Sequence, residues 1–230
     1  MTYPRSTAIS VLPESVVGKF ATKVYGLMGG FLALTAAFSA IARAAGIDRW
    51  LIVHPWVFMG LLFMELGLVM AYGGTRRSEN VALPLGLVLA YTILNGITFS
   101  AVFLSYHVST VVVTFLLTSG IFGLATVFGF IGRSILQFGH WLLIGVLGLL
   151  AAMVMNLFIG SGLMDYVISC LAVVIFTGLA VYDTQMIKER ARQNPSNIEA
   201  LDGALELYLD FVNIFINLLR LVGGSSSSKS

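Results

Sequence analysis

Several polar side chains of this chain lie inside stretches that are otherwise apolar. The clearest case is LYLDFVNIFINLLR, residues 207–220. Together with the residue just before it, its polar positions are Glu206, Asp210, Asn213, Asn217 and Arg220. An ideal helix gathers this spacing of four, three, four and three residues onto an arc about 80° wide. The rest of that helix is apolar apart from Tyr208, so we expect the stripe to face something other than lipid.

Three further charged residues are predicted to lie near this stripe. Asp183, in AVYDTQMI, comes about one turn before the end of its apolar segment. Asp210 is expected at a depth of ~10 Å in the last helix, measured from the same end of the bundle. Arg76 is expected at the same end of the bundle, at the end of a different apolar segment. Glu65 belongs to that segment and lies eleven residues before Arg76, which places it ~16 Å deeper and near the middle of the bilayer.

Carboxylates in this environment suggest ion or proton chemistry. A charged side chain at mid-bilayer costs ~2.5–3.5 kcal/mol, so it must be paired or face a hydrated interior. Two neighbouring carboxylates do not both ionise easily, and a nearby guanidinium such as that of Arg76 opposes their protonation. A pair formed by Asp183 and Asp210 could therefore bind a divalent cation such as calcium, or share a proton.

Structural interpretations of the same residues remain open. Asp183 could pair with Lys188 at the membrane interface, and Asp210 could join helices by hydrogen bonds alone. Arg76 could be only an interfacial topology signal. Three more polar residues, Asn95, Thr98 and Asn156, are predicted to form hydrogen bonds between helices rather than to bind ligands.

Other chemistries find little support in the sequence. The three histidines have no metal-ligand spacing, and no glycine-rich phosphate loop is present. We expect no enzyme activity, because no nucleophile has a base beside it in the sequence. Cys170 is the only cysteine, so no intrachain disulfide can form. The net charge of +2 is too small and dispersed to indicate a nucleic-acid partner.

The elements that must position these residues are predicted to be membrane-spanning helices. The 230 residues are 58% hydrophobic and only 10% charged, which is too few charges to cover a soluble domain. Runs of about 20 apolar residues are long enough to span a bilayer. We predict seven such helices, in an all-α bundle, at residues 24–42, 51–73, 82–104, 108–131, 141–160, 165–187 and 203–222.

This assignment divides the chain into one membrane domain and two tails. Residues 1–23 form a predicted cytoplasmic N-terminal tail, 24–222 the seven-helix domain, and 223–230 a disordered tail. Basic residues favour a cytoplasmic N-terminus. With that orientation, nine lie on the inside: Arg5, Lys19, Lys23, Arg76, Arg77, Arg133, Lys188, Arg190 and Arg192. Four lie outside: Arg43, Arg49, Arg220 and Lys229.

Four segments together resemble the transmembrane Bax inhibitor motif (Bax inhibitor-1-like) family, in its bacterial branch. They are LYLDFVNIFINLLRLVG, VYDTQMI, LNGITFSAVF and MELGLVMAYGGTRR. The resemblance implies a seven-helix bundle with the last helix in the centre. It also implies a pH-sensitive calcium leak controlled by two aspartates, which match Asp183 and Asp210. A basic latch residue matches Arg76, and an acidic residue of the second helix matches Glu65.

The leading hypothesis is therefore a pH-gated calcium leak channel, or slow transporter, in the inner membrane. Asp183, Asp210 and Arg76 would form its gate and pH sensor, with the two aspartates as the candidate calcium ligands. Its ion path would include Glu65, Glu206, Asn213 and Asn217. No cofactor is expected, calcium and protons being the transported or sensed ions. The alternative is a non-conducting regulator of a membrane protease, or a modulator of stress or cell death, as other relatives of this family suggest.

Overall fold

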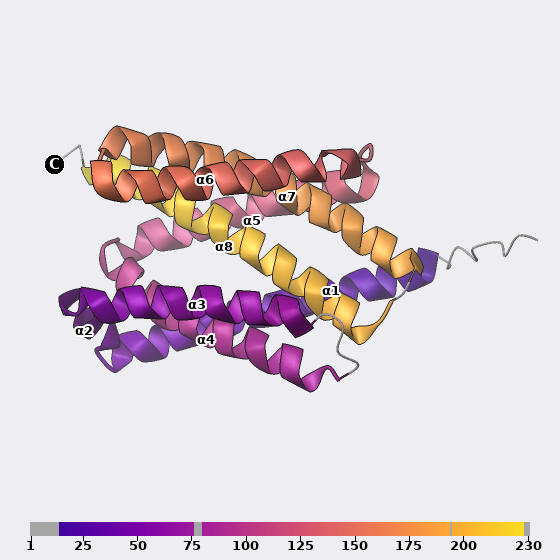
Figure 1. Cartoon of the computed structure of the whole chain (residues 1–230), viewed down its shortest axis with the longest axis horizontal. Coiled ribbons are helices and arrows are strands. Elements are labelled where there is room, and N and C mark those ends of the chain that lie inside the picture. Colours follow the sequence, from indigo (N-terminus) through magenta and orange to yellow (C-terminus); the bar gives the residue numbers. More distant parts are fainter. Residues whose placement is uncertain (1–13, 76–79, 194, 228–230) are drawn as a thin grey trace, which may run out of the picture.

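The described part of the chain is almost entirely helical, as Figure 1 shows. The computed structural model describes residues 14–75, 80–193 and 195–227. Within these ranges there are eight α-helices and a short 3-10 helix. They are α1 Glu14–Ala44, α2 Ile47–Val53, α3 Pro55–Thr75, α4 Ala82–Leu104, α5 Val108–Ile131, η1 Leu136–Phe138, α6 Gly139–Ile159, α7 Gly162–Gln193 and α8 Asn197–Ser227.

Six of the described helices are long and apolar enough to cross a membrane. These are α1, α3, α4, α5, α6 extended back to Leu136, and α7. The all-α membrane fold is thereby confirmed, but the predicted count of seven spanning helices is not. The last helix, α8, is outside this set; it carries the polar stripe, and most of its side chains are buried against other helices.

The second predicted segment, 51–73, is divided into two helices by a proline. The short α2 ends before His54, and α3 begins at Pro55. A proline ring disfavours helical geometry in the residue before it, but proline itself fits the first turn of a helix, where its missing N–H is not needed. His54 accordingly has φ −123° and ψ 66°, outside the helical region.

Both ends of the membrane domain extend further as helix than predicted. Helix α1 already begins at Glu14, inside the expected N-terminal tail, and α8 continues to Ser227, inside the expected C-terminal one. The start of α8 has a sequence signal, because Ser196 and Glu199 fit the Ser-x-x-Glu capping pattern. In the structure the Glu199 N–H donates to Ser196 Oγ at 3.2 Å.

Helix α8 packs against α1, α4, α5 and α7. In Figure 1 it runs diagonally between a group formed by α5, α6 and α7 and a group formed by α1, α3 and α4. Its apolar side is buried as well as its polar side: Leu207, Tyr208, Ile214 and Leu219 are fully enclosed. The polar stripe therefore faces protein, as the sequence predicted, but so does the opposite surface of the helix.

Helices α1 and α4 approach each other closely beside this helix. A Cβ atom added at Gly96 of α4 would lie 2.5 Å from the Thr35 backbone oxygen of α1. Only glycine allows the two backbones to come this near without displacing one of them. The contact places Thr35 and Asn95 on the side of the bundle that meets α8.

The connections alternate between the two ends of the bundle. The start of α1, η1, the end of α7 and the start of α8 lie at one end, hereafter the N-terminal end. The opposite C-terminal end holds α2, the α4–α5 and α6–α7 connections and the end of α8. Six described basic residues belong to the N-terminal end, namely Lys19, Lys23, Arg133, Lys188, Arg190 and Arg192. Arg43, Arg49 and Arg220 belong to the other, so the count favours a cytoplasmic N-terminal end.

Candidate functional site

The structure brings Asp183 and Asp210 together. Asp183 lies on α7 and Asp210 on α8, which form an antiparallel helical hairpin. The two carboxyl groups share a side-chain hydrogen bond, and the charge of Glu206 also acts on Asp210. Because ionised carboxylates have only acceptors, this hydrogen bond requires one of the two groups to carry a proton.

Asp210 is the more enclosed member of this pair. Its side chain is 4% exposed, whereas Asp183 is half-buried. The Asp210 Oδ2 atom is buried and has no hydrogen-bond partner among the described residues. Most buried polar atoms in proteins do have a partner, so an orphaned carboxyl oxygen marks a place for a water molecule, a proton or a cation.

Arg76, the predicted third member of the gate, lies outside the described residues. Helix α3 ends at Thr75, directly before it. One turn earlier, the Tyr72 hydroxyl of the same helix donates a hydrogen bond to Asp202 Oδ1 of α8. This end of α3 is therefore attached to α8, two helical turns from Asp210.

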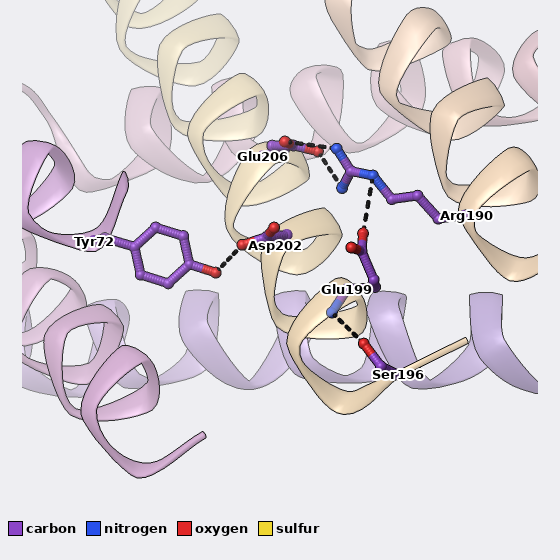
Figure 2. Close-up of polar contacts among 6 residues, drawn as sticks. All are labelled: Tyr72, Arg190, Ser196, Glu199, Asp202 and Glu206. Atoms are coloured by element: carbon purple, nitrogen blue, oxygen red, sulfur yellow. Dashed lines mark hydrogen bonds and ion pairs between the residues drawn. The ribbon is translucent and has the colours of Figure 1, made fainter. Parts of the chain in front are cut away.

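A network of polar and charged groups lies on the N-terminal side of the pair, and Figure 2 shows it without the pair itself. Arg190 of α7 bridges two acidic residues of α8. Its Nη2 donates to Glu206 Oε1 at 2.9 Å, its Nη1 lies 2.8 Å from Glu206 Oε2, and its Nε lies 3.4 Å from Glu199 Oε2. Glu206, predicted as part of an ion path, is thus held by a basic residue of the neighbouring helix.

Sequence reasoning missed four members of this network, Tyr72, Arg190, Glu199 and Asp202. For the acidic residues a signal was present, because positions 199, 202, 206 and 210 are spaced by three, four and four residues and share one helix face. Arg190 was counted only as a topology signal, because the sixth segment was predicted to end at residue 187. The structure continues that helix to Gln193 and so brings Arg190 beside α8.

Glu65 belongs to a second buried network, distinct from the aspartate pair. It is 7% exposed, and its carboxylate accepts hydrogen bonds from Thr98 Oγ1 at 2.8 Å and Asn95 Nδ2 at 3.2 Å. Asn95 Oδ1 in turn accepts from the Tyr208 hydroxyl at 3.0 Å, and that hydroxyl lies 2.7 Å from Thr35 Oγ1. The prediction that Asn95 and Thr98 join helices is confirmed, because these bonds connect α1, α3, α4 and α8.

The two asparagines of the stripe bond to their own helix. Asn213 Nδ2 donates to the Leu209 carbonyl and Asn217 Nδ2 to the Asn213 carbonyl, each at 2.8 Å. Asn217 is 1% exposed, and its Oδ1 has no partner among the described residues. The stripe therefore contains two orphaned acceptor oxygens, one on Asp210 and one on Asn217, about two helical turns apart.

A metal cage formed by protein side chains alone is not found. Within the described ranges, no group of three or more His, Cys, Asp or Glu residues could hold a metal ion. Calcium takes six to eight oxygen ligands. Asp183 and Asp210 could supply only part of such a shell, so a calcium ion at the pair would retain water.

Comparisons with known proteins identify relatives over nearly the whole chain. The profile of the family described as "Inhibitor of apoptosis-promoting Bax1" matches residues 17–227. Inner membrane protein YbhL of Escherichia coli K12 is 31% identical over 229 residues, covering 96% of this chain and 97% of its own. A membrane protein of Streptococcus pyogenes serotype M6 is 36% identical, covering 93% and 96%, respectively. The resemblance drawn from the sequence motifs and the expected multi-pass inner-membrane location are both confirmed.

Proposed function

The chain belongs to the family of the Inhibitor of apoptosis-promoting Bax1, and we propose that it is a pH-sensitive calcium leak channel, or slow transporter, of the inner membrane. The observation that carries this proposal is the carboxyl pair formed by the half-buried Asp183 and the buried Asp210. The pair joins two neighbouring helices through a hydrogen bond that depends on a proton. It also leaves one buried acceptor oxygen without a hydrogen-bond partner among the described residues.

Helix α8 is the seventh membrane-spanning helix and the centre of the bundle in this proposal. Its length of 31 residues exceeds the ~20 that a bilayer requires. Its contacts with α1, α4, α5 and α7 shield its polar stripe from lipid, which lowers the cost of carrying carboxylates across the membrane. The N-terminus then lies in the cytoplasm and the end of α8 outside.

Ions would follow the polar stripe of α8. From the cytoplasmic side they would meet Glu206, then the aspartate pair, and then the amide oxygens of Asn213 and Asn217. The orphaned oxygen of Asn217 supports this route, since it is an acceptor available for a water molecule or a hydrated cation. Glu65, whose carboxylate is positioned by Asn95 and Thr98, meets the opposite side of α8 through Tyr208 and is therefore not part of this route.

The gate would work through the charge of the aspartate pair. With one shared proton the carboxyl groups attract each other and hold α7 against α8. Loss of that proton removes the hydrogen bond and leaves two negative charges in contact, which favours an arrangement with the helices further apart. Arg76, which follows Thr75 in the sequence, would compete for one of the carboxylates, so that a proton could shift α3, α7 and α8 relative to one another.

Calcium flux into liposomes that contain only the purified protein tests this function. We expect calcium entry that exceeds that of empty liposomes and changes between about pH 5 and pH 8. Correct insertion is checked in the same preparation by protease accessibility of the N-terminal end. If folded, correctly inserted protein gives no flux at any pH, the channel proposal is wrong, and a non-conducting regulator of a membrane protease becomes the better interpretation.

A further inference from the structure

A large cavity lies at the C-terminal end of the bundle, away from the aspartate pair. Its volume is about 940 Å³, and α6, α7 and the end of α8 form its walls. Cavities of about 300–1,000 Å³ are typical of small-molecule sites. The cavity is lined by no residue of the aspartate pair, of the Arg190 network or of the Glu65 network. A ligand bound in it would therefore be separate from the proposed channel.

One end of this cavity is charged. Asp165 at the start of α7 and Arg220 near the end of α8 both line it. Asp165 is fixed in place, because its Oδ1 accepts a hydrogen bond from Asn156 Nδ2 at 2.6 Å. Arg220 is exposed and makes no hydrogen bond or ion pair with any described residue, Asp165 included. A carboxylate and a guanidinium thus share one site without neutralising each other.

The remainder of the cavity is apolar and opens toward lipid. It extends from Gly160, just after the end of α6, back along that helix to Leu150, ten residues or ~15 Å at 1.5 Å per residue. Leu157 and Tyr166 line it and are 76% and 59% exposed, on helices long and apolar enough to cross the membrane. We therefore expect the exposed apolar side chains around the mouth of the cavity to face lipid.

A ligand that fits these walls must combine a headgroup with an anionic and a cationic part and a long apolar chain. We propose that the cavity binds a phospholipid of the surrounding bilayer with a phosphoethanolamine headgroup. Its phosphate contacts Arg220, which forms strong charge-assisted hydrogen bonds with phosphates. Its ammonium group contacts Asp165, and one acyl chain lies along α6 against Met153 and Leu150.

The two charged residues also explain which lipids the site discriminates against. A phosphoglycerol headgroup carries the phosphate for Arg220 but no cation for Asp165, so it leaves that carboxylate unpaired beside another negative charge. A fatty acid or free phosphate likewise matches only one of the two charges, and free phosphate leaves the apolar part empty. An ion pair near the membrane surface favours the matching headgroup by about fivefold.

Lipid competition on the full-length purified chain tests this inference. The detergent-solubilised protein is titrated with an equal mixture of phosphatidylethanolamine and phosphatidylglycerol with identical acyl chains, and native mass spectrometry counts the lipids retained. We expect one tightly held lipid, with phosphatidylethanolamine preferred by about fivefold. Retention of neither lipid, or equal retention of both, overturns the proposal without the use of any variant.

Two variants then assign the headgroup contacts. Asp165→Asn keeps an acceptor for Asn156 but loses the negative charge, so the preference between the two lipids should disappear. Arg220→Gln should weaken binding of both lipids by about fivefold relative to Arg49→Gln. Arg49 is a matched control, since it is exposed at the same end of the bundle but does not line the cavity. Retention by Arg220→Gln equal to that of the control overturns the assignment.

A thermal measurement tests the headgroup preference without the Asp165 and Arg220 variants, and so does not depend on how well those variants fold in detergent. A lipid that binds only the folded protein raises its melting temperature. Phosphatidylethanolamine should therefore raise the melting temperature of the parent and of Arg49→Gln more than phosphatidylglycerol does. An equal rise from the two lipids contradicts the proposed headgroup site. Because calcium flux is not read in these experiments, their failure is distinguishable from failure of the channel.

Discussion

Replacement of Asp210 by Asn should remove the pH dependence of calcium flux. The substitution nearly preserves the shape of the side chain, but it removes one titrating carboxyl from the buried pair. An amide can donate to the carboxylate of Asp183 without any shared proton. The contact between α7 and α8 would then persist at every pH in the physiological range, instead of depending on a proton.

The size of the effect follows from the contact between the two carboxyl groups. Two carboxylates within hydrogen-bonding contact have charges about 4 Å apart, and at an effective dielectric constant of 20 they repel by about 4 kcal/mol. A difference of this size changes the ratio of two helix arrangements roughly a thousandfold. Asp210→Asn abolishes this repulsion, so the flux curve should become flat rather than merely lower.

The assay is calcium flux into proteoliposomes between about pH 5 and pH 8, with Asp202→Asn as a matched control. Asp202 lies on the same face of α8, and in the variant its amide oxygen could still accept the hydrogen bond from Tyr72. The control removes one negative charge of this helix without altering the pair, and it should keep the parent's pH profile. If Asp210→Asn also keeps that profile, proton gating by the pair is refuted.

Three further predictions concern orientation and stability. A reporter active only outside the cytoplasm should work when fused after Arg220 but not when inserted at 194–196; the reverse pattern would place the aspartate pair on the wrong side. Arg190→Met removes both ion pairs between α7 and α8, and should lower the free energy of unfolding in detergent by about 1–2 kcal/mol, because those pairs stay partly exposed. An unchanged stability would show that the bridge contributes nothing. Tyr208→Phe removes a fully buried hydroxyl and leaves Asn95 Oδ1 without its donor, whereas the Thr35 hydroxyl keeps its bond to the Thr92 carbonyl; chemical denaturation should measure a loss of about 1 kcal/mol. A loss below about 0.3 kcal/mol would mean that Asn95 Oδ1 finds another donor.

The positions of the helices were largely predictable because long apolar runs have few alternatives in a membrane. The segments 82–104 and 108–131 agree with α4 and α5 to the residue. The polar stripe of α8 also followed from sequence, since a helix has a fixed period and the spacing of polar residues fixes their shared face. The break at Pro55 was predictable in principle from the restriction that proline places on the preceding residue. The predicted segment 51–73 nevertheless continued across this position.

Contacts between helices that are distant in sequence were decided only by the tertiary structure. Nothing in the local sequence says that Tyr208 meets Asn95, 113 residues away, or that Gly96 lets α1 approach α4 closely enough to complete that network. The period of a helix determines which side chains share a face, but not which neighbour that face meets. The neighbour depends on how all the helices pack, and the same packing determines that Asp210 Oδ2 and Asn217 Oδ1 find no donor within the part of the chain that the structure describes.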